Sequence, residues 1–332
     1  MRKGIISALG VALLVLALPV GASAQELALG GQPVGIELAT EGVVVAGFSE
    51  LCDGDLERSP AREAGLREGD RIVQIGASEI SCAQDFIDAV AALEGKSAAL
   101  TVVRGEKELH IAVQPLQNAE GKWMLGVWLR DQSAGIGTLT FYDPATGIYG
   151  ALGHGVTDEN NGETLPIRGG RITEAQIVKV LPGSRGVPGE LSGCADRERV
   201  LGEVSKNCDK GVYGSAGAEL GEGRAAVGSA RPGSAQILTT LEGRQAHSYA
   251  VEISRVYIEN GAKRMLLTVT DPVLQELSGG IVQGMSGSPI LQEGKLVGAV
   301  THVLVSDPCR GYGISIQDML GEAGIDWEEQ AA

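Results

Sequence analysis

The most informative stretch of this sequence is "GGIVQGMSGSPI", Gly279 to Ile290. It places two serines, Ser286 and Ser288, in a glycine-rich turn that a proline closes. A serine hydroxyl acts as a nucleophile only where a base takes its proton and N–H groups stabilise the oxyanion. Glycine tolerates positive φ, so the backbone around Gly284 can turn its amides toward one point. The stretch therefore predicts a nucleophilic serine with an oxyanion hole at Gly284 and Ser286.

The residues after the turn separate the two serines. "SGSPILQEGKLVGAVTHVL" reads as a serine turn, a strand, a turn at Glu293-Gly294 and a second strand. This pattern is similar to trypsin-like proteases, in which Gly-x-Ser-Gly-x-Pro precedes a hairpin whose second strand borders the substrate cleft. The resemblance implies that Ser286 is the nucleophile and Ser288 a turn residue. It also implies that substrate adds as a strand beside Thr301 and His302.

The base is expected among four histidines. His154, in "GALGHGVTD", stands between two glycines at the end of an apolar strand, where another group has room to approach. His110 falls in the last strand of an N-terminal domain, and His247 adjoins a polar turn. His302 lies near the serine hairpin and stays a minor candidate. These positions favour His154 as the base.

Three aspartates are candidates for the acid that orients the base: Asp143, Asp158 and Asp271. Asp271 ends the strand "RMLLTVT" and keeps the order His, Asp, Ser of trypsin-like enzymes. It lies only fifteen residues before Ser286, much closer than the acid of those enzymes. The alternative is that Asp271-Pro272 merely starts a turn. The residues alone leave this choice open.

An N-terminal domain is predicted over residues 30–117. "SPAREAGLREGDRIVQIG", Ser59 to Gly76, resembles the helix-turn-strand signature of bacterial PDZ domains. In that fold a peptide adds as a strand between a groove strand and the second helix, here about Cys82 to Leu93. The resemblance implies peptide-binding positions at Val34, Gly35, Ile36, Glu37, Leu38, Phe86 and Val90. The alternative is a module that packs internally and binds no separate chain.

The remainder, residues 120–328, carries short runs of alternating apolar residues that are broken by glycine. The whole chain has 49 glycines, and aromatic residues make up only 4% of it. This texture is typical of closely spaced antiparallel strands in a barrel or sandwich. We therefore expect a mainly β protein.

The first 24 residues have the pattern of an export signal. Arg2 and Lys3 precede an apolar run, Gly4 to Val20, and Ala22-Ser23-Ala24 follows it as a cleavage site. This is the pattern of a secretory signal peptide. An uncleaved membrane anchor is the alternative, since such a run is about the minimum length that spans a bilayer. Either way, the rest of the chain is expected outside the cytoplasmic membrane.

Charge and cysteines narrow the function classes further. The net charge is −15 and no basic cluster occurs, which argues against nucleic-acid binding. Disulfides Cys52–Cys82 and Cys194–Cys208 are plausible outside the cytoplasm, with free thiols as the alternative. The five cysteines do not have metal-ligand spacing. We therefore expect neither a metal nor a cofactor.

A closer resemblance covers nearly the whole chain, which is similar to the stage IV sporulation protein B family of serine peptidases. The motifs are "GIGTLTFYDP", "GALGHG", "LTVTD", "GGIVQGMSGSPI" and "GAVTHVLVSDPCRGYGI". The resemblance implies a PDZ domain followed by a trypsin-like double β-barrel. It implies His154 as base, Asp271 as acid and Ser286 as nucleophile.

The same resemblance implies a role in endospore formation. The family is secreted from the forespore into the space between the forespore and mother-cell membranes. There it cleaves itself and the extracytoplasmic part of a regulator of a membrane-embedded protease, which activates a late sigma factor. Its PDZ domain would bind a peptide ligand or the protein's own tail. The alternatives are a non-catalytic PDZ adaptor with an inactive barrel, and a quality-control protease, which usually carries PDZ after the protease.

Overall fold

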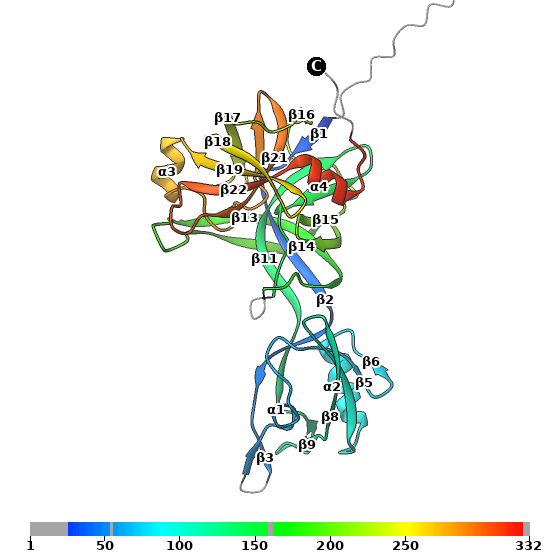
Figure 1. The fold of residues 1–332 in the computed structure, drawn as a ribbon. Coiled ribbons are helices and arrows are strands. Elements are labelled where there is room, and N and C mark those ends of the chain that lie inside the picture. The colour runs from blue at the N-terminus through cyan, green and yellow to red at the C-terminus, as the bar shows by residue number, and fades with distance from the viewer. Residues whose placement is uncertain (1–25, 54–55, 159–161, 328–332) are drawn as a thin grey trace, which may run out of the picture.

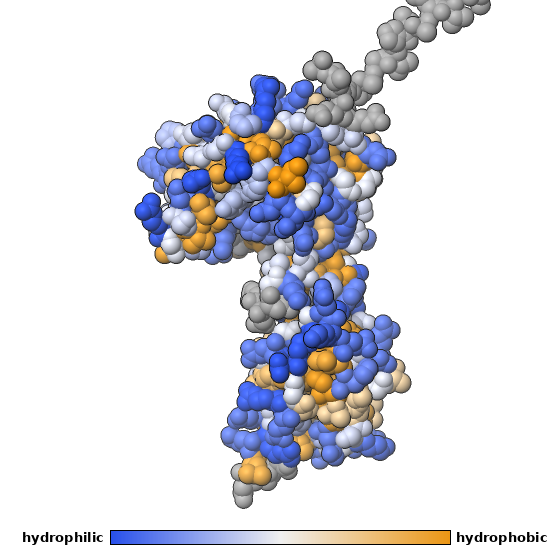
Figure 2. Space-filling model, in the orientation of Figure 1, coloured by the Kyte–Doolittle hydropathy of each residue, from blue (hydrophilic) through white to orange (hydrophobic). Residues whose placement is uncertain are grey.

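The computed structural model describes residues 26–53, 56–158 and 162–327. The predicted export segment, residues 1–24, lies outside these ranges. Within them no helix is long and apolar enough to cross a membrane. The chain is mainly β, as predicted, and forms two bodies joined by a narrow neck (Figures 1 and 2).

The first barrel is a ring of six strands, closed by pairing between β2 and β11. In ring order these are β11 (Val127–Asp143), β12 (Ile148–Ala151), β15 (Gly211–Ser215), β14 (Glu190–Cys208), β13 (Ile167–Leu181) and β2 (Pro33–Phe48). Two edge strands extend it, β1 (Glu26–Leu29) and β16 (Arg224–Ala226). Alternating residues of these strands fill the interior, with Ile36, Ile172 and Tyr149 fully or nearly buried.

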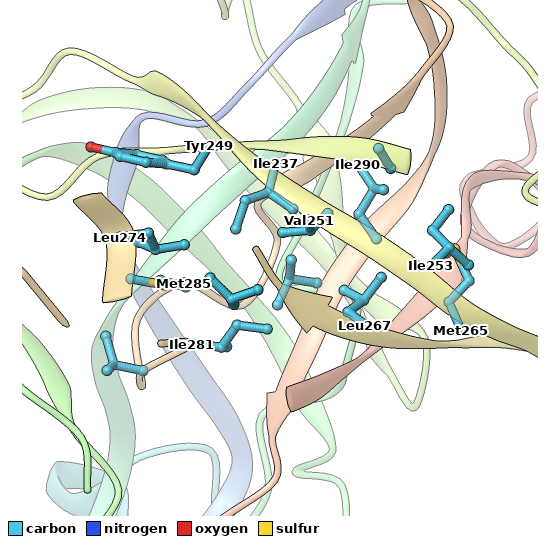
Figure 3. Packing of buried hydrophobic residues seen from close by; sticks show 14 of the residues in the cluster. Ile237, Tyr249, Val251, Ile253, Met265, Leu267, Leu274, Ile281, Met285 and Ile290 are labelled. Carbon is cyan, nitrogen blue, oxygen red and sulfur yellow. The ribbon is translucent and has the colours of Figure 1, made fainter. Parts of the chain in front are cut away.

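The second barrel is also closed and six-stranded. Its order is β17 (Gly233–Thr239), β18 (His247–Glu259), β19 (Ala262–Val269), β22 (Arg310–Ser315), β21 (Lys295–Val303) and β20 (Pro289–Gln292). Figure 3 shows its apolar core, to which the helix α3 (Pro272–Ser278) adds Leu274. Helix α4 (Ile316–Ala323) ties the barrels together, because its Glu322 pairs with Lys206 and Lys210 of the first barrel. The predicted double barrel is thus confirmed.

The PDZ domain is inserted between β2 and β11, and both strands run from the barrel into it (Figure 1). Its elements are β3 (Leu51–Asp53), β4 (Leu56–Arg58), α1 (Pro60–Glu63), β5 (Arg71–Ile75), β6 (Ser78–Glu79), α2 (Ala83–Ala92), β7 (Ala98–Arg104), β8 (Lys107–Val113), β9 (Leu116–Gln117) and β10 (Trp123–Met124). Helix α1 begins where the sequence indicates, with Ser59 as N-cap and Pro60 in the first turn. A separate apolar core holds this body together.

The structure corrects the position of the predicted groove strand. Val34–Leu38 belongs to the first barrel, where β11 pairs with one edge and β13 with the other. A peptide cannot add there, because both edges already carry their hydrogen bonds. At Gly42, whose φ is +73°, β2 exchanges its partner β13 for β5. Alternation predicts a strand but not the sheet that it joins.

The polar segment that holds Cys194 and Cys208 is the strand β14. Cys194 lies near one end of this strand and Cys208 at the other, too far apart for a disulfide, which needs Cα atoms within about 7 Å. All five cysteines are free thiols in the structure. The two plausible bridges are therefore absent.

Candidate active site

The serine turn connects α3 to β20 and is anchored in the core of the second barrel. Met285, next to Ser286, is fully buried among Leu274 and Ile281 (Figure 3). Gly284 and Gly287 have φ of +95° and +98°, values that suit glycine. A Cβ on Gly287 would lie 2.1 Å from the carbonyl oxygen of Thr138. The glycines thus permit both the sharp turn and its contact with the first barrel.

The turn leaves two amides available at the predicted oxyanion hole. The N–H of Met285 donates to the Val282 carbonyl at 3.2 Å, and Gly287 donates to Val300 at 2.7 Å. Within the described ranges, the N–H groups of Gly284 and Ser286 have no acceptor. An oxyanion hole requires donors that are fixed in place and not already used. These two amides meet that requirement.

Strand β11 of the first barrel holds the turn in place. Thr138 donates its backbone N–H to the Ser286 carbonyl at 3.1 Å and its hydroxyl to the Gly284 carbonyl at 2.8 Å. The hydroxyl of Thr140 donates to the Gly287 carbonyl at 2.8 Å. Sequence reasoning missed both threonines. The available signal was two alternating threonines in the otherwise apolar strand "GTLTF", which places two hydroxyls on one buried face.

His154 lies on the loop between β12 and β13. Leu152 and Gly153 precede it with φ of +69° and +68°. A left-handed leucine is an uncommon, strained conformation of the kind that gathers at functional sites. The Nδ1 atom of His154 is 2.8 Å from the Gly155 carbonyl oxygen. Because a carbonyl only accepts, we assign the ring proton to Nδ1, which leaves Nε2 as an acceptor.

The electrostatic setting keeps His154 neutral. Burial lowers the pKa of His154, and the Gly155 carbonyl opposes this effect. Arg264 on β19 lowers it further by charge repulsion. A general base must be unprotonated to accept a proton, so this setting suits the role expected for the ring.

A cavity of about 670 Å³ brings the candidates together, and Ser286, His154, Thr301 and His302 all line it. The Ser286 hydroxyl donates to the Thr301 carbonyl at 2.5 Å. The nucleophile, base and cleft residues expected from the sequence therefore meet at one place, between the two barrels. In the resting arrangement the hydroxyl is engaged by β21 and must leave Thr301 before it can react.

Asp271 does not join this group. It is the N-cap of α3, and its carboxylate accepts from the N–H groups of Val273, Leu274 and Ala250 at 2.9, 3.2 and 3.1 Å. These backbone bonds, first that of Ala250, lower its pKa. The expectation that Asp271 orients His154 is contradicted by these contacts. The alternative was that Asp271-Pro272 merely starts a turn, and the structure shows that these residues start the helix α3.

The other candidates are engaged elsewhere. Asp143 accepts from the Ala145 N–H and the Thr146 hydroxyl in its own turn. Asp158 pairs with Arg130 at 2.7 Å. His110 lies on β8 of the PDZ domain, and His247 begins β18. Within the described residues, no carboxylate is hydrogen-bonded to His154.

His302 is the side chain that lies against the base. Its ring centroid is 4.4 Å from that of His154, with 35° between the planes. Partial removal from water, followed by the neighbouring His154 and Arg264, lowers the pKa of His302 to about 4. At neutral pH the site therefore holds two neutral imidazoles side by side.

The PDZ domain offers a different groove from the predicted one. Phe86 and Val90 are buried in its core and cannot contact a peptide. Beside α2 lies the first part of β11, Val127–Asp131, whose one edge pairs with β2. No described strand pairs with its other edge, and Asp131 accepts from the N–H of Ala83 at the start of α2. The missed signal was "LGVWL", a glycine between apolar residues just before a strand.

Among the described residues there is no group of three His, Cys, Asp or Glu side chains that could hold a metal ion.

Comparison with known proteins matches each of the two bodies to a family. Residues 121–320 match the SpoIVB peptidase S55 family, and residues 56–104 match the PDZ domain family. Serine protease HTRA1 of Xenopus tropicalis is 40% identical over 57 residues, 17% of this chain and 12% of that protein. The chain covers only 21% and 12% of the length of two curated relatives that it matches.

Two solved structures are similar to parts of this chain. The PDZ domain of an SdrC-like protein from Listeria monocytogenes is 24% identical, with a TM-score of 0.23, over 27% of this chain and 90% of that one. The active form of the Rv3671c protease from M. tuberculosis is 13% identical, with a TM-score of 0.35, over 60% and 78% of the two chains. Since the family match spans more than half of the chain, this protein is a serine peptidase of the SpoIVB peptidase S55 family, with a PDZ domain inserted in its first barrel.

Proposed function

We propose that this protein is an exported endopeptidase of sporulation signalling, in which Ser286 is the nucleophile and His154 the base. It would cleave itself and the extracytoplasmic part of a regulator of a membrane-embedded protease, in the space between the forespore and mother-cell membranes. The observation that carries the proposal is the meeting of Ser286, His154 and two available amides in one cavity. The family match supports the reaction class.

The proposed residues would hydrolyse a peptide bond in the usual steps of a serine protease. A substrate strand lies beside Thr301 and His302, and a main-chain N–H of the substrate competes for the Thr301 carbonyl. The Ser286 hydroxyl is released, gives its proton to Nε2 of His154 and attacks the scissile carbonyl. The amides of Gly284 and Ser286 stabilise the oxyanion. His154 then gives the proton to the leaving amine, and water hydrolyses the acyl-enzyme.

The test is incubation of wild type and Ser286→Ala, with N-terminal sequencing of any fragments. Ser286→Ala should give no fragments while remaining folded. Ser288→Ala is the matched control, because Ser288 is fully buried and its hydroxyl has no partner among the described residues. Self-cleavage that continues in Ser286→Ala would remove the nucleophile assignment.

We also propose that the open edge of β11 at Val127–Asp131 takes an added peptide strand, from a substrate or from the protein's own tail. Ile87 of α2 is 56% exposed and gives this helix an apolar side chain that a peptide could contact. Ile87→Lys should slow self-cleavage without changing the rate at which a fluorophosphonate labels Ser286. Ala92→Lys, at an exposed position of the same helix, is the control. Equal rates of self-cleavage in wild type and Ile87→Lys would exclude recruitment at this groove.

A further inference from the structure

The loop that carries His154 continues as a two-stranded ribbon that lies against the PDZ domain. In this ribbon Thr157 bridges Thr164, and the N–H of Asp158 donates to the Glu163 carbonyl at 2.8 Å. Asp158 lies farther along the ribbon than this bridge, four residues after His154. Because the two sides of the ribbon are paired, a shift of Asp158 is passed back along the ribbon toward His154.

One ion pair joins this ribbon to the neck between the first barrel and the PDZ domain. Arg130 of β11 donates to the Asp158 carboxylate at 2.7 Å, and the side chain of Asp158 is only 5% exposed. The next residue of the strand, Asp131, accepts from the N–H of Ala83, the first residue of α2, at 2.9 Å. Two consecutive residues of β11 therefore hold the His154 loop and the PDZ helix.

The neck itself is only loosely constrained. The pairing of β11 with β2 is interrupted there, since Arg130 faces Val44 whereas Gln132 faces Ala39. A cavity of about 220 Å³ also separates part of the PDZ domain from the ribbon, and Asp158 lines it. A buried charge that loses its partner is strongly unfavourable. The ion pair between Arg130 and Asp158 therefore limits where the ribbon can lie.

We propose that Arg130 is a positioning residue of this peptidase: through Asp158 it sets the place of the His154 loop and couples the PDZ domain to the base. Arg130 belongs to Val127–Asp131, the segment at which we propose that a peptide strand adds. A bound strand acts on the loop by fixing or moving Arg130, so occupancy of the PDZ groove controls the rate of catalysis. The inference rests on the assignment of Ser286 and His154 made above.

The first test measures the rate at which a fluorophosphonate labels Ser286 in the full chain. Arg130→Met removes the charge and should lower the rate by about 10²-fold, the cost of a misplacement of about 1 Å. Arg130→Lys keeps a cation that can reach Asp158 and should recover most of that loss. Arg71→Met is the matched control, because Arg71 lines the same cavity but pairs with Glu41 of β2.

The second test measures the coupling in the opposite direction, because coupling between two binding sites is reciprocal. A phosphonyl group on Ser286 contacts His154 and restrains its loop. Amide hydrogen exchange in α2 should therefore become slower in labelled wild type, by about fivefold, the low end of such couplings. The change should be absent in Arg130→Met labelled to completion. Exchange in the core of the second barrel reports whether that variant is folded.

Three results would overturn the proposal. A folded Arg130→Met that is labelled as fast as wild type would exclude a positioning role. An Arg130→Lys rate as low as that of Arg130→Met would show that loss of the ion pair is not the cause. Unchanged exchange in α2 of labelled wild type would exclude the coupling, and this measurement decides even where Arg130→Met does not fold. Labelling that persists in Ser286→Ala would instead overturn the proposed function, so the two failures are distinguishable.

Discussion

The turn that carries Ser286 and the loop that carries His154 are built differently. Three hydrogen bonds from β11 hold the serine turn, and the side chain of Met285 anchors it in a barrel core. The histidine loop is held at Val156, two residues after His154. The side chain of Asn207 accepts from the N–H of Val156 and donates to its carbonyl. The ring itself has one hydrogen bond, to its neighbour Gly155, and one stacking contact, to His302.

The two constructions match the different roles of the nucleophile and the base. The nucleophile and its oxyanion donors must be rigid, because the donors act only if they point at a fixed place. The base has to accept and then release a proton, and its setting is tuned by burial and by a neighbouring ring more than by a fixed charge. We therefore expect changes to the backbone of the serine turn, or to the residues that anchor it, to damage the fold and activity together. Changes on the histidine side should alter activity and its pH dependence.

The largest expected effect is that of His154→Ala on activity. Loss of the base from a serine protease lowers the catalytic rate by up to about 10⁶-fold. Fluorophosphonate labelling and self-cleavage should both be lost, while the thermal unfolding midpoint changes little, because the ring makes few contacts. A labelling rate within tenfold of wild type would show that another group is the base.

On the serine side, Gly287→Ala should destabilise the fold the most. A Cβ would lie 2.1 Å from the Thr138 carbonyl oxygen, and φ of +98° adds strain of about 1–3 kcal/mol for a residue with a side chain. Both labelling and the unfolding midpoint should fall. Gly294→Ala is the control, because it has φ of +75° but nothing within 4 Å of its Cβ position. If the two variants lose equal stability, the contact between the barrels is not what matters.

The serine side was also the side that the sequence predicted well. The glycines, both serines and the following hairpin lie within one short segment, and local backbone chemistry determines their arrangement. The start of α1 at Ser59-Pro60 and the alternating barrel strands were predictable for the same reason. Each depends on residues that are close in the chain.

The errors arose where distant segments meet. Val34–Leu38 has the alternation of a groove strand, yet its partners, β11 and β13, come more than ninety residues later. The true open edge, Val127–Asp131, lies beyond the predicted end of the PDZ domain because the domain is an insertion. Asp271 fits the expected order of a triad, but an aspartate before proline is also a strong helix cap, and order alone cannot distinguish the two. His302 was kept as a candidate, but its contact with His154 needs both barrels.

Thr138→Val tests the link between β11 and the serine turn, with a smaller expected effect than Gly287→Ala. The shape is kept and the bond from the hydroxyl to the Gly284 carbonyl is lost, while the backbone N–H still donates to Ser286. A buried acceptor without its donor costs about 1–3 kcal/mol. Labelling should fall more than in Thr140→Val, whose hydroxyl bonds to Gly287, one residue beyond the nucleophile. Equal labelling in the two variants, at equal stability, would contradict a specific role for Thr138.

Asp271→Asn should have the smallest effect, and it decides whether the family order or the observed contacts identify the acid. Asparagine is also a good N-cap, so α3 should persist and labelling should stay within about twofold of wild type at pH 7. Loss of a triad acid would instead lower the catalytic rate by about 10⁴-fold.

The backbone donors lower the pKa of Asp271 in the folded state. The charged cap therefore stabilises the fold above the ordinary pKa of aspartate, and this contribution is lost as the pH falls through the lower folded value. Asp271→Asn should remove that part of the acid destabilisation, seen as a smaller drop in unfolding midpoint between pH 7 and pH 3 than in wild type. A large loss of labelling with an unchanged acid response would restore Asp271 to the catalytic group.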